Sequence, residues 1–420
     1  MDFDDTPEEQ AFRCEARAWL EKHLQRRRNA MSDGYLLRRP IKADEVAWAR
    51  RYQAAKAHDG YGAITWPREY GGFGGSVVQQ VIWFEEESHF EVPTNIFGVG
   101  LGLAGPTIMV HGTQDQKATF LPRILAGEVV FCQLFSEPSA GSDLAAVQTR
   151  AQTRAQRHGE QWRINGQKVW NSLAHLADYG ILLARTDPAV PKHKGLSFFI
   201  LPMRQTGVTV RPIRQITDAA NFNEVFLDDV EVPDTNRLGA VGEGWAVALT
   251  TLMNERLALG GRTPGPDPEA LLDLAASSVL DGQPAILDAA VRQELAEVYA
   301  MQSALRFTGW RALTAISQGK PPGPVGSIGK LAAGLLAQRS GALAMGLQGA
   351  NGALWGETAP GQGLWQQVYL SAAATRIGGG PDEVQRNIIA ERLLGLPGEL
   401  REDKNRPFNQ VPTGPGRKSA

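Results

Sequence analysis

Apolar side chains recur at helical spacing over much of the first 128 residues. In residues 6–28 they form one face of a predicted helix, made of Phe12, Ala16, Trp19, Leu20 and Leu24. Thr6 can cap this helix, Pro7 suits its first position, and the arginines at 26–28 favour its carboxyl end. Similar spacing over 43–58 and 76–90 predicts further helices. We therefore expect an N-terminal helical domain over residues 1–128.

From about residue 129 the apolar repeat shortens to that of β-strands. Short apolar runs separated by turn residues occur at 131–135, 180–184, 196–201, 207–210 and 222–232. This pattern is typical of a small antiparallel barrel or sandwich. Asn165-Gly166 lies between apolar pairs and predicts a hairpin turn. We expect a middle antiparallel β domain over residues 129–238.

Helical spacing returns after the glycines of 239–244 and dominates to about residue 395. Segments 262–268 and 320–326 interrupt it, and each contains three prolines. We expect a C-terminal helical bundle over 239–400 and a loose polar tail over 401–420. The predicted fold class is thus α+β, with helices, then strands, then helices.

The composition excludes several classes of protein. A length of 420 residues suggests about three domains, and 43% hydrophobic with 21% charged residues describes a globular chain. A net charge of −2 gives no sign of nucleic-acid binding. Two distant cysteines favour a reducing compartment, no apolar run reaches membrane-spanning length, and the acidic start lacks a secretion signal. We expect a cytoplasmic protein, and no metal site is predicted.

Residues 100–105 match the dinucleotide-binding pattern G-x-G-x-x-G. That pattern requires a preceding strand, a following helix and an acidic residue about twenty positions on. Here Pro106 follows at once, and the surroundings indicate helix or loop. Close helix packing explains these glycines better than a nicotinamide site.

The most informative stretch is 131–143, where a strand-like run leads into Ser-Glu-Pro-Ser-Ala-Gly-Ser-Asp. Glycine and small hydroxyl side chains let the backbone approach a flat or anionic ligand and offer hydrogen bonds to it. Taken alone, the stretch could equally be an ordinary surface turn.

This stretch closely resembles the flavin-binding motif of the acyl-CoA dehydrogenase family. The resemblance continues in order at residues 66–72, 112–117, 165–170, 223–226 and 387–392. It implies a small β domain between two helical domains, FAD as cofactor and an acyl-CoA thioester as substrate. It also implies an electron-transfer flavoprotein as electron acceptor, a place in fatty-acid or other lipid metabolism, and a homodimer or homotetramer.

The resemblance assigns residues to the cofactor as well. Ser136 and Ser142 match positions that contact the flavin and its pyrophosphate, and Ser142 also matches a substrate contact. Trp170 and Ser172 match the pair beside the isoalloxazine, while Gln133 and Phe135 are expected to contribute chiefly through their backbone. For Trp170 the alternative is ordinary core packing.

The reaction requires a carboxylate that removes the proton next to the thioester carbonyl, and an apolar pocket suits such a base by raising its pKa. Many family members carry this glutamate in a Tyr-Glu-Gly-Thr segment, but here Gly379 occupies its position. The isovaleryl type carries it in a Glu-Arg-Leu segment on a helix after the β domain, which matches Glu255 and Arg256. We therefore expect Glu255 to be the base, Arg256 to contact substrate and the Gly379 N–H to face the thioester oxygen.

Other interpretations of these acids remain. Glu255 could simply pair with an arginine on a helix surface. Asp382 and Glu383 could be rival bases, although acids after Pro381 at a helix start favour capping.

The chain departs from the family at two places. The Arg-x-x-Phe-Gly stretch that holds the neighbouring subunit's FAD is missing, and residues 262–290 hold an inserted segment instead. Pro381 replaces a threonine that commonly touches FAD. A heteromer in which another chain completes the site is therefore an alternative to a homo-oligomer.

Two further functions fit the same fold. One is a flavin monooxygenase or an enzyme resembling nitroalkane oxidase, and the other is a non-catalytic partner subunit. The sequence does not identify the acyl chain, which could be short, branched, long or steroid-derived.

Overall fold

The computed structural model describes residues 5–27, 41–156, 159–260, 268–320, 323–398, 403 and 405–411. The N-terminal part contains α1 (Pro7–His23), α2 (Ala43–His58), α3 (Val77–Glu87), α4 (Gly105–His111) and α5 (Gln114–Leu125). Thr6 and Glu9 form a reciprocal capping box that begins α1. The helix ends at His23 rather than at Arg28, because the backbone turns extended at Leu24 and Arg26 then bridges to Phe90. The expectation that the arginines end this helix is wrong.

The glycines of 100–105 belong to a helical segment, as expected. Gly100–Ala104 form a π-helical turn that continues directly into α4. A Cβ on Gly105 would lie 2.1 Å from Cζ2 of Trp66, so the glycine is required by close packing. The surroundings of a dinucleotide site, a strand followed by a helix, are not found here.

The middle part is one eight-stranded sheet. Its strands are β1 (Phe131–Leu134), β2 (Arg150–Gln156), β3 (Gly159–Lys168), β4 (Tyr179–Arg185), β5 (Leu196–Pro202), β6 (Val208–Ile213), β7 (Phe222–Pro233) and β8 (Arg237–Leu238). Their order is β6-β7-β3-β2-β4-β5-β8, and β1 lies beside β4. The sheet is mostly antiparallel as expected, but β1 and β4 run parallel.

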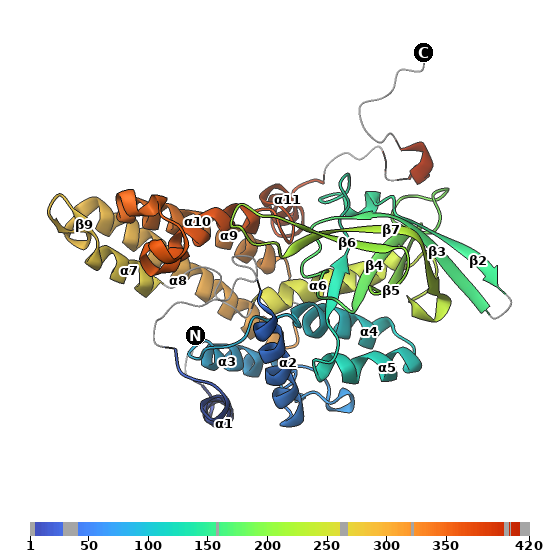
Figure 1. Cartoon of the computed structure of the whole chain (residues 1–420), viewed down its shortest axis with the longest axis horizontal. Helices are drawn as coiled ribbons and strands as arrows, with labels where there is room; N and C mark the ends of the chain where they lie inside the picture. Colours follow the sequence, from blue (N-terminus) through green and yellow to red (C-terminus); the bar gives the residue numbers. More distant parts are fainter. Residues whose placement is uncertain are drawn as a thin grey trace, which may run out of the picture.

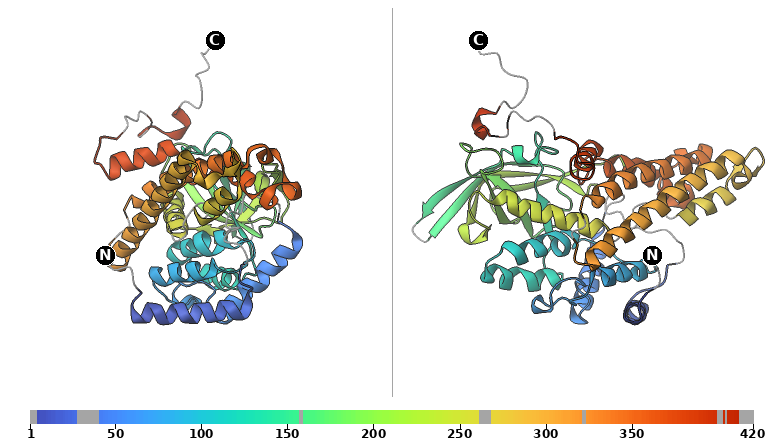
Figure 2. Two further views of the ribbon diagram at one scale, coloured as in Figure 1. Left: turned by 90° about the vertical axis from the view of Figure 1, so that its left-hand side faces the viewer. Right: turned by 180° about the vertical axis from the view of Figure 1, so that it is seen from behind.

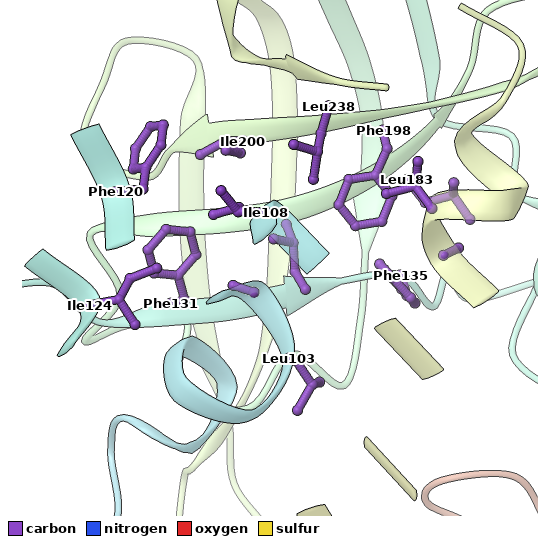
Figure 3. Close-up of a cluster of buried hydrophobic side chains, with 14 of the residues drawn as sticks. Leu103, Ile108, Phe120, Ile124, Phe131, Phe135, Leu183, Phe198, Ile200 and Leu238 are labelled. Carbon is purple, nitrogen blue, oxygen red and sulfur yellow. The ribbon is translucent and has the colours of Figure 1, made fainter. Parts of the chain in front are cut away.

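The sheet is buried on both faces at its centre. Alternate residues of β4 and β5 enter two different apolar clusters, with Leu183 and Phe198 on one face and Leu182 and Phe199 on the other. This double burial explains why these strands are continuous apolar runs in the sequence. Figure 3 shows the first cluster, where Ile108 and Phe120 from the helices meet Phe131, Phe198 and other sheet residues.

Asn165-Gly166 is not a hairpin turn, so that prediction is wrong. Both residues lie inside β3, where the pairing with β7 shifts between Ile164 and Gly166. The Asn165 side chain donates to Asp229 Oδ1 and accepts from the Asp229 N–H, both at 2.9 Å. A side-chain amide thus replaces ladder hydrogen bonds at a bulge. Tertiary pairing has overridden a strong local turn signal.

The C-terminal helices are α6 (Gly244–Gly260), α7 (Pro268–Ser277), α8 (Ala289–Ser317), α9 (Val325–Gln348), α10 (Leu364–Thr375) and α11 (Asp382–Arg392). A small hairpin, β9 (Val279–Leu280) with β10 (Gln283–Pro284), follows α7. Helices α7 to α10 form an arm that extends away from the sheet, while α11 lies where the arm meets it (Figures 1 and 2). Among the described residues, no helix is long and apolar enough to cross a membrane.

Two details of the ends and thiols complete the fold. Residues 405–411 pack against the sheet domain, which differs from the loose tail expected over 401–420.

Cys14 is exposed on α1, Cys132 is buried in β1, and both are free thiols. Burial raises the pKa of the Cys132 thiol, so it stays protonated. The predicted domain boundaries after residues 128, 238 and 400 stay predictions.

Candidate active site

The motif 131–143 forms a tight turn at the end of β1. Glu137 and Ala140 exchange two backbone hydrogen bonds of 3.0 and 3.1 Å across Pro138 and Ser139. This closed turn directs the following residues outward, and both Gly141 and Ser142 are exposed. The local sequence therefore produces a rigid loop that presents backbone and a hydroxyl to the solvent.

A buried ion pair supports the base of this turn. Lys168 is 0% exposed, and its Nζ lies 2.8 Å from Glu137 Oε1, with the carbonyls of Phe135 and Leu183 as further acceptors. Glu137 also accepts from the backbone N–H groups of Gln148 and Thr149. Burial alone would raise the pKa of Glu137, but the ammonium and these donors outweigh it and hold the pKa below its usual value. The carboxylate is therefore ionised at neutral pH.

Trp170 lies directly beside this turn. The N–H of Val169 donates to the Ser136 carbonyl at 2.9 Å, so the end of β3 is joined to the motif. Trp170 has a φ of 64°, and its indole is 60% exposed with only an edge contact to Phe222. Such exposure excludes core packing as its role. A large flat side chain is held open to the solvent by its own strained backbone.

Asn171 connects three segments of the site. Its Nδ2 donates to the Gln133 carbonyl at 2.7 Å, and its backbone exchanges hydrogen bonds with Asn223. Its Oδ1 is buried and has no hydrogen-bond partner among the described residues. A buried acceptor of this kind is satisfied by a donor from outside the chain, either a ligand or water.

These features fit a flat heteroaromatic ligand that carries a polar edge and a phosphate group. Trp170 offers an open ring face, and within the described chain the hydroxyls of Ser136, Ser142 and Ser172 donate to no other residue. A Cβ on Gly141 would meet nothing within 4 Å, so the backbone beside Ser142 is accessible. The carbonyls of Gln133 and Phe135 are already occupied by Asn171 and Lys168, which restricts the expected backbone contacts of these two residues.

Helix α6 passes beside the N-terminal helices and the sheet. Thr251 Oγ1 lies 3.0 Å from Thr107 Oγ1 in a buried contact, and Thr250 Oγ1 lies 2.8 Å from His111 Nε2. Burial lowers the pKa of His111, so the ring is neutral at neutral pH. Glu255 is four residues beyond Thr251 on the same helix. The side chains of Glu255 and Arg256 lie outside the described residues, so their predicted roles are not placed.

The glycine segment before α11 has an unusual backbone. Gly379 and Gly380 have φ values of 69° and 96°, which favour glycine. Gln385 Nε2 donates to both of their carbonyls at 3.1 Å, which fixes the turn. The structure thus gives Gly379 a defined, side-chain-free position at the start of α11.

Asp382 does not cap α11 through its side chain, so the capping prediction is wrong for it. The residue is 2% exposed, and one carboxylate oxygen accepts from Arg376 Nε at 2.6 Å and Nη2 at 2.5 Å. The other carboxylate oxygen, Oδ1, is buried and has no hydrogen-bond partner among the described residues. Glu383 is exposed.

Comparison with known proteins identifies the fold. Three models of the acyl-CoA dehydrogenase family match the chain: the N-terminal domain at 6–128, the middle domain at 132–230 and the C-terminal domain at 242–394. The chain belongs to the acyl-CoA dehydrogenase family. The family resemblance, the α+β class and the order of the three parts are thereby confirmed.

Individual acyl-CoA dehydrogenases are similar to the chain over nearly its whole length. The chain is 37% identical to "Acyl-CoA dehydrogenase IpdE1" of Mycobacterium tuberculosis, over 93% of this chain and 98% of the relative. Two solved structures are similar as well. The "Tcur3481-Tcur3483 steroid ACAD" has 30% identity and a TM-score of 0.79, and the match covers 95% of this chain and 100% of that chain. The "ChsE4-ChsE5 complex" from Mycobacterium tuberculosis has 29% identity and a TM-score of 0.75, with the same coverage. The protein is an acyl-CoA dehydrogenase of the family that uses FAD.

Four residues of this acyl-CoA dehydrogenase site were not assigned from the sequence. Lys168 and Asn223 lie in segments that carried the resemblance, and Glu137 lies in the motif itself, but none was given a role. Asn171 was passed over between Trp170 and Ser172. The available signal for Lys168 was its place four and six positions after the inward-facing Ile164 and Trp162.

Proposed function

We propose that Glu255 is the catalytic base that removes the proton next to the thioester carbonyl. The observation that carries this proposal is the absence of any side chain at Gly379, together with the ion pair in which Arg376 binds Oδ2 of the rival acid Asp382. These two facts leave the glutamate on α6 as the acid that the family pattern predicts. This is the isovaleryl-type placement of the base.

The remaining assignments follow the same scheme. The Gly379 N–H donates to the thioester oxygen and stabilises the charge that develops there. Ser142 and Arg256 bind the acyl-CoA, while Gln133, Phe135, Ser136, Ser142, Trp170 and Ser172 hold the cofactor. FAD, when bound, would supply the acceptor for the hydride that leaves the next carbon. The Lys168–Glu137 pair keeps the flavin motif in place, as its buried contacts support.

For the substrate we propose a thioester with a bulky, ring-bearing acyl group. One similar structure is named a steroid acyl-CoA dehydrogenase, and Gly379 carries no side chain at the position where many family members carry the glutamate. Electrons then pass to an electron-transfer flavoprotein. We infer a cytoplasmic location from the two free thiols.

We also propose that the chain works as part of a heteromer. The two similar structures carry paired names, and one is titled a complex. The arm of this chain has an apolar groove of about 570 Å³ between α7 and α8, lined by residues such as Leu272, Ile286, Leu287 and Tyr299. This groove lies far from the flavin motif (Figure 1) and suits a partner subunit of the same fold rather than a substrate.

The test is an anaerobic titration of the FAD-loaded protein with short, branched, long and steroid-type acyl-CoAs, monitored by flavin absorbance. Glu255→Gln should reduce the rate of bleaching by about a thousandfold or more, because a general base is lost, while FAD stays bound. Glu383→Gln is the matched control and should bleach normally. Bleaching retained in Glu255→Gln but lost in Glu383→Gln would transfer the role to Glu383.

Aerobic assays and FAD reconstitution of the same protein separate the other functions. Oxygen consumption without acyl-CoA would indicate the monooxygenase or nitroalkane-oxidase type. A chain that stays colourless with FAD alone, and becomes yellow only with a partner subunit, would indicate a non-catalytic or incomplete subunit.

A further inference from the structure

Residues 405–411 fold back on the loop that joins β4 to β5. Pro407 forms an antiparallel bridge with Pro191. Two backbone hydrogen bonds of 2.9 Å follow: the Phe408 N–H donates to the Val190 carbonyl, and the Asn409 N–H donates to the Pro188 carbonyl. In Figure 1 this short red segment lies above the sheet, away from the helical arm. We call Asp403 with residues 405–411 the C-terminal strap.

Phe408 anchors the strap on a buried arginine. The guanidinium of Arg185 lies 3.5 Å from the centre of the Phe408 ring, and Phe408 is only 9% exposed. The same guanidinium donates to the carbonyls of Ala145 and Val147, which directly follow the flavin motif. One cation therefore contacts both the strap and the backbone that leaves the motif.

Lys192 makes a second, charged connection. Its side chain is 5% exposed, and its Nζ lies 2.7 Å from Asp143 Oδ2 and 2.5 Å from Asp403 Oδ2. A buried ammonium requires compensation by opposite charge. Here the compensation comes from two segments 260 positions apart: the end of the flavin motif and the strap.

Asp143 directly follows Ser142. The side chain of Ser142 is itself held by no hydrogen bond to another described residue. On its other side the loop is held by Glu137, through the turn with Ala140 and the N–H groups of Gln148 and Thr149. Gly141, Ser142 and Asp143 are exposed between these supports. Besides the hydrogen bond from the Ala146 N–H to the Asp143 carbonyl, the Asp143–Lys192 ion pair is the described contact that restrains this exposed part of the loop.

We propose that Lys192 and Asp403 are positioning residues, through which the C-terminal strap holds the Ser142 loop in the conformation that binds FAD and acyl-CoA. The inference rests on the proposed role of Ser142, but the restraint of the loop is independent of any ligand. Asp403 acts through Lys192, and Lys192 acts through Asp143. Neither residue touches the reacting atoms.

The first experiment measures hydrogen exchange of amides 141–148 in the chain without FAD. Lys192→Met and Asp403→Asn should each accelerate exchange in this segment by about tenfold, because a charged support is lost, and should leave the amides of β4 and β5 unchanged. Lys192→Arg should restore protection. Lys194→Met is the matched control, since Lys194 lies on the same loop but is exposed, and it should behave as wild type.

The second experiment measures the dissociation constant of FAD and the steady-state constants for acyl-CoA. Lys192→Met and Asp403→Asn should weaken FAD binding by about tenfold and raise KM, with kcat at saturation within about twofold of wild type. The double variant should be no worse than Lys192→Met, because both act through one connection.

The outcomes separate the two proposals. Unchanged exchange over 141–148 overturns the strap, whatever the ligand binding. Faster exchange with unaltered FAD and acyl-CoA constants overturns the positioning role, because the loop then does not serve the cofactor. A wild-type chain that binds no FAD contradicts the proposed function, yet the exchange measurement still decides whether the strap restrains the loop.

Discussion

The sheet around the flavin motif and the helical arm differ in how far their side chains are buried. In the sheet, β4 is buried from Gly180 to Arg185, and even a lysine is enclosed with its counter-ion. In the arm, Leu287 and Tyr299 are 62% and 61% exposed, and the ion pair Arg339–Glu294 is open to solvent. The sheet domain buries its apolar residues and its internal charge, whereas the arm exposes apolar side chains on its surface.

The difference indicates which part depends on another molecule. A pre-formed site needs a scaffold whose geometry does not vary with its surroundings, and double burial with a paired internal charge provides it. An exposed apolar groove gains stability only when a partner binds, so its stability depends on concentration. We therefore expect substitutions in the two regions to show different signatures.

The largest effect is expected at the buried ion pair of the sheet. Lys168→Met leaves the Glu137 carboxylate buried without its counter-charge and should lower the free energy of unfolding by about 3–5 kcal/mol. Chemical denaturation at neutral pH measures this loss. Lys192→Arg, which keeps its charge, serves as the control, and a loss below about 1 kcal/mol for Lys168→Met would show that the sheet does not rely on the pair.

Disruption of the arm should act on assembly and not on folding. Leu287→Asp combined with Tyr299→Asp places two charges in the groove and should weaken partner binding by about 2 kcal/mol or more. Analytical ultracentrifugation and denaturation of the separated chain should show weaker assembly with unchanged unfolding.

Ile216→Asp is the control for that pair, because Ile216 is 76% exposed on the sheet domain and lies outside the groove. Assembly that resists the double substitution but fails in Ile216→Asp would place the partner on the sheet instead.

Replacement of two glycines by alanine should change stability least, but with opposite signs in the two regions. At Gly180 in β4 a Cβ would lie 2.5 Å from Leu134 Cδ1, so Gly180→Ala should cost about 1–3 kcal/mol. At Gly309 in α8 nothing lies within 4 Å, so Gly309→Ala should stabilise the separated chain by up to about 1 kcal/mol. Thermal unfolding of both variants measures the difference. Equal signs would remove the contrast between the two regions.

The order of helices and strands was predictable because each has a local signal. The capping box of Thr6 and Glu9, the apolar runs of β4 and β5, and the glycine-rich entry to α6 all depend on neighbouring residues. The failures came where distant partners decide. Asn165-Gly166 pairs with Asp229 instead of turning, and the parallel alignment of β1 with β4 depends on a register that no local pattern encodes.

The same division applies to the site. The motif 131–143 and Trp170 could be proposed from the sequence because the resemblance lies in contiguous residues, and their cofactor roles stay predictions. The groups that hold them could not be proposed, since Lys168 with Glu137, Asn171 with Gln133 and Lys192 with Asp403 are joined only by folding. The roles of Glu255, Arg256 and Gly379 stay predictions for the experiments above.

The two thiols differ in accessibility, and this difference makes the opening of the sheet measurable. Cys14 is accessible in the native chain and should react with an alkylating reagent at once. Cys132 is enclosed in β1, within the 131–143 motif, and is kept protonated, so it should react only when that strand detaches. The rate at which the second label is incorporated therefore measures how often β1 detaches from the sheet. The chain carries this reporter without any engineered probe.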